Sequence, residues 1–223
     1  MTPSEKRVLL VHSVFAGLSL AAMLSPIGPS AGYRVLVLVL IYNAGMILLG
    51  LLWNHQRWLD IMAFAIPLSI LQVLPDWFLS QRAGTLVFIN DGSPRIGSVP
   101  LFMAGLWTLP VFVSIFLAVR ARKRWPALSR MMASLLGGGA AFTIYALSEV
   151  VLTRIPLWTA QNTASVFGAA VYVLPAELIL ALFAVHAYFL SETQPWLVRW
   201  FYAGTTMLVY TGSLAVSLLF LGQ

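Results

Sequence analysis

The feature that most constrains this chain is a series of apolar stretches, each about 20 residues long, which is the length a helix needs to cross the hydrocarbon core of a bilayer. The composition agrees, since 60% of the residues are hydrophobic and only 9% are charged, against about 25% charged in a typical soluble domain. We therefore predict an all-α, polytopic transmembrane bundle of about seven spans, forming a single domain over residues 1–223. The predicted spans are Val8–Leu24, Val35–Trp53, Leu59–Leu79, Val99–Val119, Met131–Leu152, Ser165–Leu190 and Leu197–Leu221.

The basic residues predict how the bundle is oriented. Nine Lys and Arg fall on the side of the N-terminus and four on the other, and the positive-inside rule then places the N-terminus in the cytoplasm and the C-terminus outside, across a plasma (inner) membrane. The net charge of +6 is explained by these span ends, and because no basic stripe with interleaved aromatics lies outside the spans, we expect no nucleic-acid partner. The nine are Lys6, Arg7, Arg57, Arg120, Arg122, Lys123, Arg124, Arg130 and Arg199, and the four are Arg34, Arg82, Arg95 and Arg154.

Proline and glycine positions predict how the helices pack. Pro67, Pro110 and Pro175 lie inside three predicted spans, where they should kink the helices and open cavities between them. The run Gly137–Gly139, with Ala133 four residues before it, predicts a face of small residues on which another helix packs closely.

One connection, Gln81–Ser98, is longer than the others. Its Asp91-Gly92 pair, between two short β-capable stretches, is typical of a hairpin, so we expect a short external loop or hairpin between spans 3 and 4 that caps the bundle. The alternative is a solvated loop without a role.

Three acids lie inside predicted spans and are the candidate catalytic residues: Asp76, Glu149 and Glu177. A charged side chain in the hydrocarbon costs at least about 2.5 kcal/mol, so each acid needs a reason to be there. All three fall in the middle or external part of the bilayer, near the loop that carries Asp91 and Arg95, and one shared polar cavity accounts for them. Burial among apolar walls favours the protonated form of a carboxyl group, which suits a general acid.

Other side chains are expected to line the same cavity and bind a substrate. Gln72 and Tyr145 each lie four residues before an acid, Asp76 and Glu149 respectively, and so share a helix face with it. The other candidates for substrate binding are Trp107, Tyr172, Asn43, Arg95 and Asp91.

Structural roles are the alternative for each of these residues. Asp76 and Glu149 lie close enough to helix ends to reach interfacial water or to pair with Arg82 or Arg154, and Glu177 could form an interhelical hydrogen bond. With no Cys and three scattered His, the sequence predicts no metal site, and we expect no cofactor.

The seven kinked spans, the acids on separate helices and the stretch IGSVPLFMAGLW from Ile96 to Trp107 resemble the small integral-membrane isoprenoid enzymes. This group includes the membrane-bound terpene cyclases of meroterpenoid pathways and the membrane carotenoid hydratases and cyclases. The resemblance implies that intramembrane Asp and Glu start the reaction and that aromatic walls stabilise a carbocation. The Pro-Leu-Glu-Glu motif of the heterodimeric lycopene cyclases is absent from this chain, which counts against that branch.

These patterns leave three functions open. The first is an enzyme that cyclises or hydrates a hydrophobic isoprenoid by acid initiation, with the lipid bilayer and an apolar small molecule as its partners. The second is a proton-coupled transporter, against which we note that the sequence shows no internal repeat. The third is a non-catalytic membrane subunit whose polar groups serve helix packing. The sequence predicts no oligomeric state.

Overall fold

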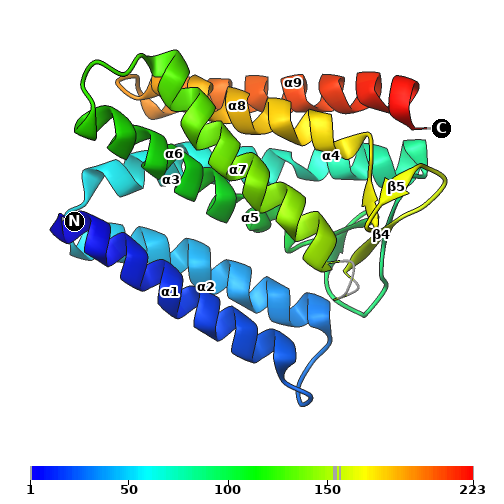
Figure 1. Cartoon of the computed structure of the whole chain (residues 1–223). Coiled ribbons are helices and arrows are strands. Elements are labelled where there is room, and N and C mark those ends of the chain that lie inside the picture. Colours follow the sequence, from blue (N-terminus) through cyan, green and yellow to red (C-terminus); the bar gives the residue numbers. More distant parts are fainter. Residues whose placement is uncertain (1, 153–154, 156, 223) are drawn as a thin grey trace.

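The computed structural model describes residues 2–152, 155 and 157–222, which form a bundle of long helices (Figure 1). Among these residues, seven helical segments are long and apolar enough to cross a membrane, which confirms the predicted all-α bundle and a multi-pass membrane protein. The two termini lie at opposite ends of the bundle (Figure 1). The helices are α1 (Pro3–Leu24), α2 (Ala31–Leu52), α3 (Gln56–Leu71) continued by α4 (Val73–Trp77) and the π-helix η1 (Phe78–Ala83), α5 (Met103–Leu106) continued by α6 (Thr108–Arg124), α7 (Arg130–Leu152), α8 (Val173–Ser191) and α9 (Trp196–Leu221).

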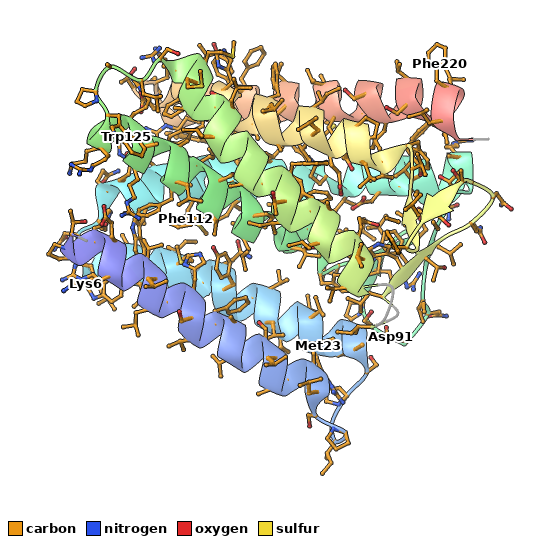
Figure 2. All side chains as sticks on the ribbon, in the orientation of Figure 1. Lys6, Met23, Asp91, Phe112, Trp125 and Phe220 are labelled. Atoms are coloured by element: carbon orange, nitrogen blue, oxygen red, sulfur yellow. The ribbon has the colours of Figure 1, made fainter. Side chains whose placement is uncertain are left out.

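The outer surface of the bundle is apolar. No residue of α1 is buried, and at the far end of the chain Phe220 projects outward with 80% of its surface exposed (Figure 2). Exposed apolar side chains in this number belong in lipid rather than in water.

The core divides into a filled half and a hollow half. Near the N-terminus, Trp58, Phe64 and Phe112 are fully buried in a continuous apolar cluster (Figure 2 labels Phe112). Basic residues and ion pairs gather at this end, including Arg199–Asp60 at 2.7 Å and Arg120–Glu5 at 2.9 Å. The opposite end, where the strands lie, is called the strand end below.

The small-residue face of α7 is confirmed. A Cβ atom on Gly137 would lie 2.6 Å from the Ser114 carbonyl oxygen of α6, and one on Gly138 would lie 2.7 to 3.0 Å from Leu182 of α8. Ala133 is fully buried on the same helix. Glycine therefore lets α7 pack directly on two neighbouring helices.

The three prolines predicted to kink helices lie in different settings. Pro67 lies inside α3, and Pro110 lies inside the α5–α6 segment, which is interrupted at Trp107, three residues before the proline. The kink predicted at Pro175 is wrong, because Pro175 is the third residue of α8. The first turn of a helix has no intrahelical acceptor for its N–H groups, so proline is tolerated there without a bend. Because α8 begins at Val173, Glu177 lies near the start of this helix and not at the middle of a span.

Short strands cap the strand end, which confirms a structured cap but corrects its predicted turn. Asp91-Gly92 does not join a strand pair. The first strand, β1 (Leu86–Phe88), pairs antiparallel with β4 (Trp158–Ala160), from a distant part of the chain. The remaining strands form two hairpins, β2 (Arg95–Ile96) with β3 (Val99–Pro100), and β5 (Ser165–Val166) with β6 (Ala169–Ala170).

These elements form an internal repeat, which corrects the expectation that the chain has none. A long helix, a single strand, a two-residue hairpin and a second long helix occur in this order twice, first from α3 to α6 and again from α7 to α8. The pairing of β1 with β4 is symmetric, because Leu86 pairs with Ala160, Val87 with Thr159 and Phe88 with Trp158. Two equivalent strands that pair antiparallel in this register are related by a two-fold axis through the Val87–Thr159 pair.

Candidate functional site

A cavity of about 250 Å³ lies inside the strand end of the bundle. All three candidate catalytic acids line it, on α4, α7 and α8, together with Trp107, Tyr145 and Tyr172. Among the described residues of the wall there is no Lys, Arg or His. The remaining wall residues are Leu79, Thr85, Leu86, Phe88, Met103, Leu106, Leu109, Pro110, Ile144, Ser148, Trp158, Ala160, Ala170, Val173 and Tyr210.

The three carboxyl groups are electrostatic neighbours. Asp76 interacts with Glu149, and Glu177 interacts with both of them. Asp76 and Glu177 are only 4% and 2% exposed, whereas Glu149 is partly exposed. Within the described part of the chain, Asp76 Oδ2 and Glu177 Oε2 have no hydrogen-bond partner. The three carboxyl groups therefore share one cavity whose described wall offers them no basic side chain as a counter-charge.

Aromatic rings form much of the remaining wall. The Trp107 ring, at the junction of α5 and α6, lies 5.1 Å from the Tyr145 ring of α7 and 6.0 Å from the Tyr210 ring of α9, centroid to centroid. The indole nitrogen of Trp107 is buried and, like Asp76 Oδ2, has no hydrogen-bond partner among the described residues. The cavity thus pairs proton donors with electron-rich rings.

The cap is fixed over the cavity by a buried hydrogen bond. The hydroxyl groups of Thr85, before β1, and Tyr172, before α8, lie 2.7 Å apart. Thr85 and Tyr172 belong to different repeats, so this bond joins the two halves above the acids.

Four candidate binding residues lie outside the cavity wall. Gln72 is fully buried beside Asp76 on the same helix but does not reach the cavity. Asn43 of α2 donates its amide to the carbonyl oxygens of Val39 and Gly105, at 2.8 and 3.2 Å, and so ties α2 to α5.

Asp91 and Arg95 hold the cap together. Arg95 donates to the backbone carbonyls of Phe88, Ile89 and Ser98. The Asp91 carboxylate accepts the Gly32 N–H at 2.6 Å, which caps the N-terminus of α2. Partial burial acts to raise the pKa of Asp91, but hydrogen bonds from Ser93 and Gly32 lower it to about 2.

Several wall residues are not among the candidates predicted from the sequence. Tyr210, for example, lines the cavity from α9. Thr85, Phe88 and Trp158 reach the wall through the strands of the cap. The one signal that pointed to Tyr210 was its position deep in an apolar span, where a hydroxyl group needs a polar neighbour.

Fold and site together define a polytopic helical membrane protein with an acidic, aromatic-walled cavity inside the helical bundle. Residues 73–221 match a family described as a domain of unknown function, DUF6989, and the chain belongs to this family. The matched segment holds every described residue that lines the cavity. No match was found among curated proteins or among solved structures.

Proposed function

We propose that this protein is a membrane-embedded enzyme that cyclises or hydrates a hydrophobic isoprenoid by protonating it. The observation that carries the proposal is the convergence of three carboxyl groups and three aromatic rings, those of Trp107, Tyr145 and Tyr210, on one cavity whose described wall has no basic residue. A protonated carboxyl group in such surroundings is a general acid, and apolar walls suit an alkene or epoxide substrate.

The residues divide into a proton donor, a proton acceptor and a cation-stabilising wall. Glu177 donates its proton to an alkene carbon or an epoxide oxygen, which leaves a carbocation and a Glu177 carboxylate. The face of Trp107 or of a tyrosine stabilises a desolvated cation by about 2 kcal/mol. Asp76 or Glu149 then passes its own proton to the Glu177 carboxylate and becomes the carboxylate that accepts the final proton. In cyclisation the final cation loses this proton, whereas in hydration a water molecule adds to the cation and then loses it.

The orientation of the site in the membrane is part of the proposal. The nine basic residues at the N-terminal side favour a cytoplasmic N-terminus in a plasma (inner) membrane. The cavity would then lie in the external half of the bilayer.

A proton-coupled carrier is a second candidate, because the internal repeat is a feature of many transporters. In its disfavour, the three acids lie together at one end. The other half of the bundle is filled by fully buried aromatic residues such as Trp58 and Phe112.

Deuterium incorporation tests the enzyme. Vesicles containing the full chain are incubated in D₂O with a panel of linear isoprenoid alkenes and epoxides, and the products are analysed by mass spectrometry. An alkene protonated by an exchanged carboxyl group gains one carbon-bound deuterium, and an epoxide gives a deuterium-free carbon skeleton in a rearranged or hydrated product.

The Glu177→Gln variant should lose product while keeping the helical content and elution volume of the parent. Asp91→Asn is the matched control, since it exchanges an acid for an amide outside the cavity, and it should retain product. Full turnover by Glu177→Gln, or unchanged substrates with the folded parent protein, contradicts the proposal.

A further inference from the structure

The two repeats place the cavity residues in equivalent pairs. Trp107 and Glu177 follow their hairpin ends, Pro100 and Ala170, by the same number of residues. On the preceding helices, Asp76 of the first repeat corresponds to Glu149 of the second. A polar residue lies four positions before each acid, Gln72 or Tyr145, and a leucine lies two positions before it, Leu74 or Leu147.

The first repeat has one residue more between its acid and its strand than the second. This residue coincides with η1, since a π-helix accommodates an inserted residue without breaking the helix. The register difference therefore has a structural cause, and the equivalence of Asp76 and Glu149 stands.

A two-fold axis generates two equivalent junctions between the repeats. One lies between α8 and α3, and the other between α6 and α7. The first junction is filled by α9, which packs against both α8 and α3 and brings Tyr210 to the cavity. At the second junction α6 and α7 pack directly on each other in the basic half of the bundle, where a Cβ atom on Gly137 would lie 2.6 Å from the Ser114 carbonyl oxygen. A gap between α6 and α7 is therefore confined to the strand end, and α2 packs on α3 and α5 rather than between them.

Exposure of the wall residues indicates that the cavity opens at this second junction. Leu106 and Leu109 on one side and Ile144 and Ser148 on the other are only partly buried, although they line the cavity. Of the wall residues away from the junction, Leu79 and Tyr172 are buried, whereas Leu86 and Ala160 of the cap and Val173 at the start of α8 are also partly buried. On the outer face of α7 beside this opening, Leu147 is 60% exposed, so the opening faces the hydrocarbon region.

We infer that the α6–α7 junction at the strand end is a lateral portal through which an apolar, chain-like lipid passes directly between the bilayer and the acidic cavity. The portal is the counterpart, across the two-fold axis, of the junction that α9 closes. This inference rests on the proposed function for the reaction that follows, but the passage of an apolar chain can be measured without any turnover.

Photolabelling in vesicles tests the portal. A long-chain alkyl diazirine dissolved in the bilayer is photolysed, and labelled cavity residues, in particular Tyr172 and Glu177, are quantified by mass spectrometry. A charged, membrane-impermeant diazirine added to the water on both sides is the second probe. The portal predicts that the alkyl probe labels the cavity and that the charged probe does not.

Substitutions at the portal should change the labelling of the cavity in opposite directions, depending on the size of the new side chain. Ile144→Trp should lower cavity labelling by the alkyl probe about tenfold, the effect of adding about 1.4 kcal/mol to a barrier, and Ile144→Ala should raise it. Leu147→Trp is the matched control, because it adds the same ring on the lipid-facing side of the same helix, and it should label like the parent.

Equal cavity labelling in Ile144→Trp and Leu147→Trp, or cavity labelling by the charged probe alone, overturns the portal. Portal-dependent labelling combined with no deuterium incorporation would instead leave the portal standing and contradict the enzyme.

Discussion

Among single residues, the Thr85–Tyr172 pair shows how the cap and the cavity depend on each other. Both hydroxyl groups are buried, and they satisfy one another at 2.7 Å across the two repeats. A buried polar group without its partner costs more than the bond itself contributes, so the two residues should behave as a unit.

Tyr172→Phe is therefore expected to destabilise the protein by about 1 to 3 kcal/mol, because it strands the Thr85 hydroxyl group. Thr85→Val in the same chain removes the stranded group and should restore most of the loss. Thermal unfolding in detergent, followed by circular dichroism, measures the cycle. Additive effects of the two substitutions would show that the hydroxyl groups do not interact.

Asp91 provides a second test at this scale, through pH. Its folded-state pKa of about 2 lies below the ordinary value of 3.8, so its contribution to stability is fully present above about pH 4 and is lost as the pH falls towards 2. Asp91→Ala removes the cap of α2 and should cost about 1 kcal/mol at neutral pH, whereas Asp91→Asn should cost little. The stability difference between parent and Asp91→Ala should shrink in acid, and a difference independent of pH would contradict the capping role.

For the helices, the glycines of α7 give the sharpest prediction. Gly137→Ala and Gly138→Ala place a Cβ atom against the backbone of α6 and α8, so each should lower the melting temperature and loosen the bundle. Gly139→Ala meets no atom within 4 Å and is the matched control. It should be neutral or should stabilise by up to about 1 kcal/mol, because alanine is the better helix former. Equal effects at all three positions would mean that α7 does not pack as described.

The helices could be predicted from the sequence, but the strands could not. Hydropathy over about 20 residues reports burial in lipid, which is a local property, and it located all seven spans. A short apolar strand has the same hydropathy as helix, so the segment around Ala169-Ala170 was interpreted as part of a span that begins at Ser165. That error moved Glu177 towards mid-membrane and Pro175 into a helix interior.

The sequence predicted the site residues whose chemical type is unusual in an apolar span, and it did not separate the other polar residues by role. Three acids in apolar spans had to be explained, and all of them line the cavity. Asn43 and Arg95 are also polar residues and were candidates for the cavity wall, yet they donate hydrogen bonds to backbone carbonyls outside it. Pairing β1 with β4 depends on contacts between distant parts of the chain, which no local pattern encodes.

At the scale of the whole molecule, the orientation in the membrane is open to a direct measurement. The chain has no cysteine, so a single introduced thiol reports one position. Ala127 lies in the connection at the basic end and Ala164 in the cap, and both are exposed. In intact cells an impermeant maleimide should label Ala164→Cys and not Ala127→Cys, whereas lysed cells should show both. Labelling of Ala127→Cys alone in intact cells would reverse the orientation.

The strand pair at the two-fold axis has a mechanical consequence for the whole bundle. Val87 and Thr159 come from different repeats, and their ladder is the place where the two halves are joined directly by backbone hydrogen bonds over the cavity. The ladder therefore limits how far the two repeats can separate at the strand end. The direct packing of α7 on α6 at Gly137 and Ser114 sets the same limit in the basic half of the bundle.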